Sequence, residues 1–466
     1  MNTGKCHDLL SLPAIRRAAV LSALLIAGCH KGSYICPTCG GGTKTANLQA
    51  SISGLVGSRL VLENNSTPLN QFNGQASNGS AVLLGTASFN SGYNITVRTQ
   101  PTNPSQICVV TNGTGNVGNT DVTNIAVACT TSPPRFLYAV NRGSGDISAY
   151  AIDVTSGALT AIAGSPFTSG SNPVAGAVDP SGNYLYVANQ GSASVSAFTI
   201  NRTSGALAAV SGSPFPTGVV PTSVAIDPSS SYVYVTSRSP GTVWGYAINA
   251  GSGALTPLSA GIAATGGSPS AVTVDPLGDF VYVANEADGT FSAFSVKTGL
   301  LVADTGSPFQ AGASPAALAL DPTGHDIYIV NSTANTLTAI SGLPVSATTT
   351  RTPISGSPYA TGLLPTSIAL GVVDSLVYVA NQGSNSLSGF KLNATTGVLT
   401  PVPGSPFPAA QPTWVVIDPT GRFVYVTNSG MNKVSAYAIA PTSGALTLIG
   451  SPSAAGLMPT ALAISD

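Results

Sequence analysis

The segment FVYVANEADG, residues 280–289, contains the pattern that decides the fold of this chain. Its VYVAN core consists of apolar, β-branched and aromatic residues that favour strands, and a polar loop follows it. The pattern recurs every 46 to 50 residues, with no helical stretch between the copies. The seven copies are LYAVN (137–141), LYVAN (185–189), VYVTS (233–237), VYVAN (281–285), IYIVN (327–331), VYVAN (377–381) and VYVTN (424–428). A strand-rich period of this length is typical of a β-propeller.

Each period divides into four predicted strands. In one period, residues 221–227 form the innermost strand, 232–237 the second and 242–248 the third, and the fourth follows the SGAL turn at 252–255. A D-P turn joins the first two strands, because proline fixes φ and the aspartate side chain caps the turn. We expect each of these aspartates to serve its own turn rather than a metal ion. The turns begin at Asp179, Asp227, Asp275, Asp321 and Asp418.

The two ends of the repeat region complement each other. The first copy begins at Phe136 without an innermost strand, and residues 458–465 are an innermost strand without a continuation. The C-terminal strand should therefore complete the first blade, which removes the open edges of the ring. The sequence predicts an all-β chain in which residues 135–466 form a seven-bladed β-propeller closed by the C-terminal strand.

The N-terminus is typical of an export signal. Basic residues precede the apolar run 18–28, and the stretch Ile26-Ala27-Gly28-Cys29 follows the pattern of small residues at a cleavage site. This stretch resembles a bacterial lipobox, which implies lipid attachment at Cys29. We therefore predict a lipoprotein signal peptide over 1–28, and an exported protein that a lipid anchors in the cell envelope, in the periplasm or at the outer surface. The alternative is a plain signal peptide that is cleaved elsewhere.

A tether and a small module separate the anchor from the propeller. Residues 29–46 are predicted to be a flexible tether, whose Cys36-Pro37-Thr38-Cys39 motif is either a redox motif or a local disulfide. Alternating strands predict a β-sandwich module over 47–131, with a hairpin turn at Asn112-Gly113. Within it, Cys108 and Cys129 are predicted to form a disulfide, which stabilises a loop of this length by about 3 kcal/mol.

Composition excludes several classes of partner. Charged residues make up 7% of the 466 residues, the formal net charge is -1, and no basic block occurs. Nucleic-acid binding is therefore not expected, since it depends on clustered positive charge. No motif for a cofactor or a metal ion is present, so none is predicted. The membrane contact that we expect is the lipid anchor.

One position in each repeat marks a candidate site. The start of an innermost strand and the end of the second strand lie on the same face of a propeller, so the residue after each Y-V-x-N should line the mouth of the central channel. Two arginines fall at this position, and so does Glu286, one of the two glutamates in the chain. The seven residues at this position are Arg142, Gln190, Arg238, Glu286, Ser332, Gln382 and Ser429.

The motifs together resemble a known family. The Y-V-x-N strands, D-P-x-G turns, SGAL turns and GSPF segments resemble the lactonase family of seven-bladed propellers, typified by 6-phosphogluconolactonase, and the related Y-V-T-N repeat family of surface proteins. In the lactonases a glutamate follows the V-x-N of a middle blade, and Glu286 matches it. The resemblance implies Glu286 as a catalytic base. Lactone opening also needs a cation or a hydrogen-bond donor for the oxyanion, and our candidates for this role are Arg238 and Arg142, which lie outside the family pattern.

The family also places arginine or histidine directly after the proline that opens an innermost strand. None of the equivalent residues is basic in this chain, and four are threonine. They are Val174, Thr222, Ser270, Ala316, Thr366, Thr413 and Thr460.

Three functions are therefore compatible with the sequence. The first is a propeller that binds an envelope glycan, a peptide or a surface protein at the channel mouth, the second is a lactone hydrolase, and the third is a non-catalytic scaffold. A hydrogen bond between Glu286 and Arg238 would favour the enzyme, and exposed aromatic side chains would favour ligand binding. We expect Trp414 to pack between blades rather than to contact ligand. The candidate ligand contacts are Gln190, Gln382, Ser270, Thr222 and Trp414.

Overall fold

The computed structural model describes residues 44–56, 60–65, 67–72, 81–99, 101, 106–131, 136–153, 156–343, 351–371 and 375–465. The predicted signal peptide, Cys29 and the Cys36–Cys39 motif lie outside these residues. The described residues form β-strands and one three-residue 3-10 helix, η2 (Ser429–Met431). No helix among them is long and apolar enough to span a membrane.

The first module consists of two four-stranded sheets, with strand orders β4-β1-β8-β6 and β3-β2-β5-β7. Its strands are β1 (Thr45–Ser53), β2 (Leu60–Asn64), β3 (Thr67–Phe72), β4 (Ala81–Ser88), β5 (Gly92–Thr99), β6 (Gln106–Thr111), β7 (Thr114–Asn116) and β8 (Val122–Thr131). The apolar side chains that alternate along these strands form one buried cluster, with Leu48, Ile52 and Ile125 at most 2% exposed.

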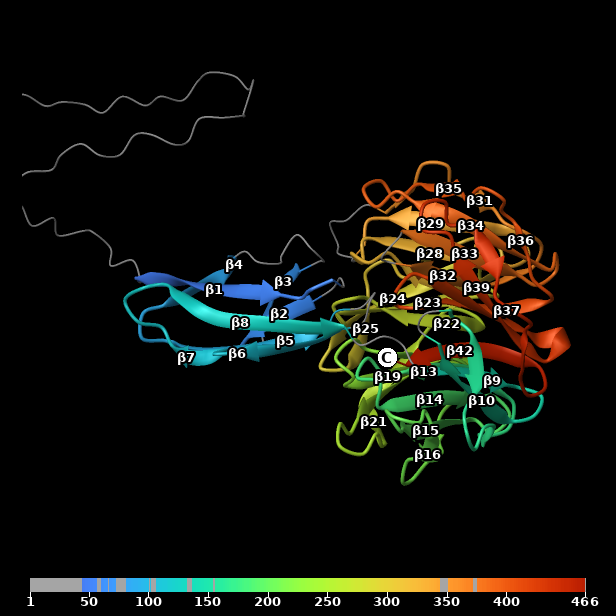
Figure 1. The fold of residues 1–466 in the computed structure, drawn as a ribbon, viewed down its shortest axis with the longest axis horizontal. Helices are drawn as coiled ribbons and strands as arrows, with labels where there is room; N and C mark the ends of the chain where they lie inside the picture. The colour runs from blue at the N-terminus through green and yellow to red at the C-terminus, as the bar shows by residue number, and fades with distance from the viewer. Residues whose placement is uncertain are drawn as a thin grey trace, which may run out of the picture. The chain divides into compact units, whose positions relative to one another are not determined.

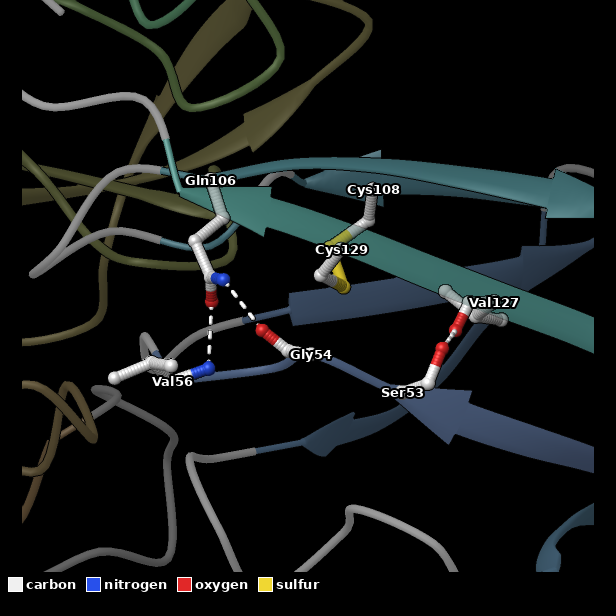
Figure 2. Close-up of a disulfide and its surroundings, with 7 residues drawn as sticks. All are labelled: Ser53, Gly54, Val56, Gln106, Cys108, Val127 and Cys129. Atoms are coloured by element: carbon white, nitrogen blue, oxygen red, sulfur yellow. Dashed lines mark hydrogen bonds between the residues drawn. A yellow bond between two sulfur atoms is a disulfide. The ribbon is translucent and has the colours of Figure 1, made fainter.

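The predicted disulfide joins neighbouring strands of the module. Cys108 on β6 lies opposite Cys129 on β8, and the two sulfur atoms are bonded (Figure 2). Beside them the buried amide of Gln106 donates to the carbonyl of Gly54 and accepts from the N–H of Val56, both at 2.7 Å (Figure 2). These bonds satisfy a polar group that would be costly to bury unpaired.

The predicted hairpin at Asn112-Gly113 is wrong. Strand β6 pairs with β8 and β7 pairs with β5, so this turn carries the chain from one sheet to the other. Asn112 adopts a left-handed φ of 54°, and a Cβ on Gly113 would lie 2.4 Å from the carbonyl oxygen of Ile95. The turn residues are therefore needed for a tight corner against β5.

Seven further sheets are the blades of the propeller (Figure 1). In blades 1 to 7, the innermost strands are β42 (Pro459–Ser465), β13 (Pro173–Val178), β18 (Val219–Ile226), β22 (Pro269–Val274), β27 (Pro315–Leu320), β32 (Pro365–Gly371) and β37 (Pro412–Ile417). The second strands are β9 (Phe136–Asn141), β14 (Tyr184–Asn189), β19 (Tyr232–Ser239), β23 (Phe280–Asn285), β28 (Asp326–Asn331), β33 (Leu376–Asn381) and β38 (Phe423–Asn428). The third strands are β10 (Asp146–Ile152), β15 (Ser194–Ile200), β20 (Thr242–Ile248), β24 (Thr290–Lys297), β29 (Thr336–Ser341), β34 (Ser386–Leu392) and β39 (Lys433–Ile439).

Six of the seven outer strands are short, and in these six blades a second segment pairs with the third strand. The first set is β11 (Leu159–Ala161), β16 (Leu207–Ala209), β21 (Leu255–Ala264), β25 (Leu300–Ala303), β30 (Thr352–Pro353), β35 (Leu399–Pro401) and β40 (Leu446–Leu448). The second set is β12 (Phe167–Thr168), β17 (Phe215–Pro216), β26 (Phe309–Gln310), β31 (Tyr359–Ala360), β36 (Phe407–Pro408) and β41 (Ser453–Ala454). The predicted single fourth strand is therefore divided, because a G-S-P segment interrupts it. In five blades the serine hydroxyl of this segment accepts a backbone N–H of the third strand in place of the interrupted strand. In blade 2, for example, the N–H of Ala197 donates to the hydroxyl oxygen of Ser213 at 2.9 Å.

The Y-V-x-N strands are apolar because both of their faces are buried. In β14, Tyr186 and Ala188 pack toward blade 3, whereas Leu185 and Val187 pack toward blade 1. The same alternation produces seven apolar clusters, one between each pair of neighbouring blades. A strand buried on both sides reads as a continuous apolar run.

The tyrosine of the pattern also joins neighbouring blades by a hydrogen bond. Its hydroxyl donates to the carbonyl of the glycine in the SGAL-type turn of the next blade. Gly205 shows why glycine is needed there, because its φ is +72° and a Cβ would lie 2.4 Å from the ring of Phe136. The bonded pairs are Tyr138–Gly205, Tyr186–Gly253, Tyr234–Gly299, Tyr328–Gly397, Tyr378–Gly444 and Tyr425–Gly157.

The ring closes as the sequence predicts. The C-terminal strand β42 pairs antiparallel with β9, with Pro459 opposite Asn141 and Ser465 opposite Phe136 (Figure 1). The bond from Tyr425 to Gly157 joins blade 7 to blade 1 in the same way as the other blades are joined. The all-β, seven-bladed fold with a preceding two-sheet module is thus confirmed.

Candidate functional site

The mouth ring is the set of seven residues that follow the Y-V-x-N strands. In six blades the N–H of this residue donates to the carbonyl of the residue before the inner-strand proline, at 2.9–3.2 Å. The bonded pairs are Arg142–Met458, Gln190–Asn172, Glu286–Ser268, Ser332–Ser314, Gln382–Leu364 and Ser429–Gln411. In blade 3, Pro221 lies opposite Ser237, which places Arg238 at the same end of the blade. The predicted positions therefore share one end of the propeller.

The side chains of the mouth ring form two bonded pairs. A guanidinium N–H of Arg238 donates to a carboxylate oxygen of Glu286 at 2.7 Å, and a guanidinium N–H of Arg142 donates to the amide oxygen of Gln190 at 2.9 Å. Each pair joins equivalent positions of neighbouring blades. The structure thus brings Glu286 to Arg238, the partner that the sequence offered first, while Arg142 contacts Gln190.

The ion pair is accessible to a ligand. The side chains of Arg238 and Glu286 are 46% and 37% exposed. An ion pair at this exposure contributes about 0–1 kcal/mol to stability, so a ligand can open it at little cost. Once opened, the carboxylate can accept a proton and the guanidinium can stabilise a developing negative charge.

A β-bulge lies beside every mouth position. In all seven blades the register between the innermost and second strands shifts across the residue that follows the proline, as between Pro221 and Ser223. A bulge turns the side chain of the extra residue out of the regular alternation. These residues are the positions at which the lactonase pattern places arginine or histidine.

The hydroxyl groups at the bulges link the blades to one another. Thr222 donates to the carbonyl of Pro269 at 2.8 Å, and Ser270 donates to the carbonyl of Pro315 at 2.7 Å. Thr366, Thr413 and Thr460 make equivalent bonds to the innermost strand of the following blade. The hydroxyls of the two predicted ligand contacts Thr222 and Ser270 therefore link neighbouring blades.

The remaining predicted contacts differ in their surroundings. Trp414 is partly buried and packs against two apolar clusters, one between blades 7 and 1 and one between blades 1 and 2. Gln382 is partly exposed at the mouth, and its N–H is bonded to Leu364. The tyrosines of the Y-V-x-N strands are 0% exposed, so they present no face to a ligand.

Sequence reasoning missed a group of exposed apolar side chains at the mouth. Five of these side chains lie next to the mouth ring, in the loops that precede the innermost strands or, for Met431, in η2, and Val219 is the first residue of the innermost strand β18. A signal was available, because the two residues before the inner-strand proline are apolar in blades 1, 3 and 6 and small or polar in the others. The exposed residues are Val219, Leu363, Leu364, Met431, Leu457 and Met458, at 49–61%.

The structure offers no evident metal centre in the part of the chain that it describes, where no group of three or more His, Cys, Asp or Glu side chains could hold an ion. The aspartates of the D-P turns bond to their own turns, as the sequence predicts. Asp227, for example, accepts the N–H groups of Ser229, Ser231 and Tyr232 at 2.5–3.1 Å.

The fold and the mouth together define a seven-bladed propeller with an arginine–glutamate pair at one end of its axis. The model of the lactonase, seven-bladed β-propeller family matches residues 110–221, 209–305 and 300–417, more than half of the chain. The chain therefore belongs to this family. A comparison with curated proteins finds no match.

Solved structures of related fold include three with lactonase names. A putative 6-phosphogluconolactonase from Bacteroides uniformis is 16% identical, with 72% of this chain and 100% of that chain covered and a TM-score of 0.63. A putative 6-phosphogluconolactonase from Bacteroides fragilis is 19% identical over 72% and 99%, with a TM-score of 0.62. The periplasmic gluconolactonase of Pseudomonas aeruginosa is 18% identical over 72% and 99%, with a TM-score of 0.59. At these identities the likeness shows the fold alone.

Proposed function

We propose that this protein is an exported, lipid-anchored hydrolase that opens lactones at the mouth of its propeller. The observation that carries the proposal is the accessible Arg238–Glu286 pair, in which one base and one cation meet across neighbouring blades. Membership of the lactonase family supports the reaction class. The export signal predicted over residues 1–28 supports a location in the cell envelope, with lipid on Cys29.

The reaction uses the two side chains in sequence. The lactone carbonyl displaces Glu286 from Arg238, and the freed carboxylate takes a proton from water as the water oxygen bonds to the carbonyl carbon. The guanidinium of Arg238 stabilises the oxyanion of the tetrahedral intermediate. The intermediate collapses as the ring C–O bond breaks, and Glu286 returns its proton to the leaving oxygen. The product is the open-chain hydroxy acid.

The substrate that fits best carries no phosphate. Phosphate recognition favours several cationic donors, whereas the mouth ring supplies two, Arg142 and Arg238. The family's basic positions after the prolines hold Ser, Thr, Val or Ala. An enzyme in the envelope would also meet external lactones rather than a phosphorylated sugar lactone made in the cytosol.

The test is lactone hydrolysis by the purified full chain in a pH-stat, corrected for spontaneous opening. The panel contains unphosphorylated γ- and δ-lactones and 6-phosphogluconolactone. We expect turnover of the unphosphorylated lactones and a loss of roughly 100-fold to 10,000-fold in kcat in Glu286→Gln, since a general base contributes about this much. Glu63→Gln, which changes the other glutamate of the chain, is the matched control and should keep full activity.

A second function, binding without catalysis, is favoured by one observation. None of the seven bulge positions supplies a cation, so Arg238 would have to serve both as the partner of Glu286 and as the stabiliser of the oxyanion. The mouth would then bind a neutral polar ligand, such as an envelope glycan, a peptide or a surface protein. Saturable binding of such a ligand without turnover of any lactone would replace the first proposal with this one. If the protein shows neither lactone turnover nor ligand binding, the function that remains is a non-catalytic scaffold.

A further inference from the structure

We propose that the substrate of the mouth is a lactone with a hydrocarbon tail. This inference rests on the proposed function, because it assigns the lactone ring to the Arg238–Glu286 pair. It adds the chemical class of the substituent. The tail would lie on a set of apolar side chains that we call the apolar arc. The arc consists of Leu363 (56% exposed), Leu364 (50%), Met431 (49%), Leu457 (55%) and Met458 (50%).

The apolar arc occupies three consecutive blades. Leu363 and Leu364 precede the innermost strand β32 of blade 6, and Met431 lies in η2 of blade 7. Leu457 and Met458 precede β42 of blade 1. Because the innermost strands β32, β37 and β42 lie side by side around the axis, these loops occupy neighbouring positions at the mouth end. Large side chains that are half exposed in one sector are typical of a surface that binds something.

The geometry of the loops does not explain this choice of residues. Leu364 and Met458 have left-handed φ angles of 46° and 52°. The equivalent residues Asn172, Ser268 and Ser314 have the same conformation, and asparagine is a residue type that tolerates it well. Leucine and methionine at these positions do not stabilise the turn, and their side chains leave apolar surface exposed to water. A ligand that covers them would offset this cost.

The polar pair and the apolar arc lie on one rim. The backbone bonds Gln382–Leu364 and Arg142–Met458 tie the arc to the mouth ring. In a ring of seven blades, blade 4 with Glu286 stands three steps from both blade 7 and blade 1. A molecule with its lactone at Glu286 would therefore direct a tail across the mouth onto the arc. A fully polar sugar lactone would leave the arc uncovered.

Two other occupants fit less well. A membrane or a second copy of the chain that covered the whole mouth would also bury the Arg238–Glu286 pair, and removing a charged pair from water is costly. Val219, 61% exposed, adds apolar surface beside Arg238 in blade 3. The mouth thus alternates apolar and charged surface within one rim, which suits an amphipathic small molecule.

The experiment compares γ-butyrolactones with a straight alkyl tail of none, four or eight carbons. The full chain is assayed for kcat/KM, and Glu286→Gln is titrated by calorimetry so that binding is measured without turnover. The eight-carbon lactone should have a kcat/KM at least about tenfold higher than the tailless lactone. The reason is that a tail half covered by the arc removes methylene groups from water. Affinity should rise in the same order.

The variant that tests the arc is the double change Leu364→Asn and Met458→Asn, which copies the residue at position 172 of blade 2. We expect the ratio of kcat/KM for the eight-carbon and tailless lactones to fall at least about threefold, because two of the five apolar side chains of the arc become polar. Leu448→Asn is the matched control, because Leu448 is 48% exposed on the outer strand β40. It should keep the full ratio.

The outcomes separate this inference from the proposed function. Turnover without any dependence on tail length overturns the inference and leaves the hydrolase in place. Binding that depends on the tail without turnover overturns the hydrolase and keeps the ligand class. Neither turnover nor binding overturns both. If lipid vesicles or self-association require Leu364 and Met458 while no lactone binds, the arc is a surface for those partners and the inference is wrong.

Discussion

The two ends of each blade are built from the same pair of inner strands, yet they differ in what the repeats hold constant. At the turn end, the aspartate recurs and its carboxylate serves its own turn. At the mouth end, the backbone bond between the mouth ring and the preceding loop recurs, whereas the side chains change from blade to blade. A fixed side chain therefore marks a folding role, and a fixed backbone with variable side chains marks the surface on which chemistry can be placed.

The largest effect on stability is expected from breaking the turn end. Asp418 is 2% exposed and accepts the N–H groups of Thr420, Arg422 and Phe423 at 3.1, 2.8 and 2.6 Å. Asp418→Ala would leave these donors without their partner, at a cost of roughly 3–5 kcal/mol in unfolding free energy. Urea denaturation measures this cost.

The same variant sharpens the contrast with the mouth. Asp418→Ala should keep kcat/KM within about twofold, whereas Glu286→Gln should keep its unfolding free energy within about 1 kcal/mol of the original, because an exposed pair contributes little. A turn-end variant that lost activity while remaining folded would contradict the division between the two ends.

A second test of the turn end uses pH. Burial raises the pKa of Asp275 to about 6 in the folded protein, against about 3.9 in an unfolded chain. Between these values the folded state binds more protons than the unfolded state, so this group makes stability fall as the pH rises from about 4 to about 6. The contribution is at most about 3 kcal/mol, and Asp275→Asn should remove it.

The measurement is the unfolding free energy of both proteins at several pH values from 4 to 7. The unfolding free energy of the original protein minus that of Asp275→Asn should fall by about 2 kcal/mol as the pH rises across this range. A difference that stays constant with pH would mean that Asp275 titrates as it does in water. Because only the change with pH is used, the hydrogen bonds that asparagine fails to replace do not affect the result.

The fold was predictable because its signals are repeated. Seven copies of one strand pattern establish the period, and the unmatched strands at Phe136 and at residues 458–465 establish the closure that β42 and β9 make. The turn at Asn112-Gly113 was mispredicted for a physical reason. These residues specify a left-handed bend, but not which strand pairs with the segment that follows.

The site was predictable only in part. The period places Arg238 and Glu286 at equivalent ends of neighbouring blades, which explains why the sequence could bring them together. It does not specify how each side chain is used. Thr222 and Ser270 were candidates for ligand binding, yet the bulge turns their hydroxyls toward the next blade. The strand pattern contains no sign of that bulge, since the alternation of side chains on either side of it looks regular.

The smallest effect, and the one that decides this last point, is expected from Ser270→Ala. The hydroxyl of Ser270 bonds to the carbonyl of Pro315 in the next blade, so its removal should lower the unfolding free energy by about 1 kcal/mol. Alanine already occupies the equivalent position 316 of blade 5, which shows that the ring tolerates it. Lactone turnover should change by less than about twofold if the hydroxyl only links blades.

A loss of tenfold or more in lactone affinity, with stability unchanged, would instead make Ser270 a ligand contact as the sequence suggested. In that case the ligand must reach past Arg238 and Glu286 to the bulges, and the binding site would extend from the rim toward the positions where the family carries its basic residues. The bond to Pro315 would then be one that the substrate replaces on binding. The residues that bind the ligand would then include the bulge residue of each innermost strand, which directly follows the proline at the mouth end.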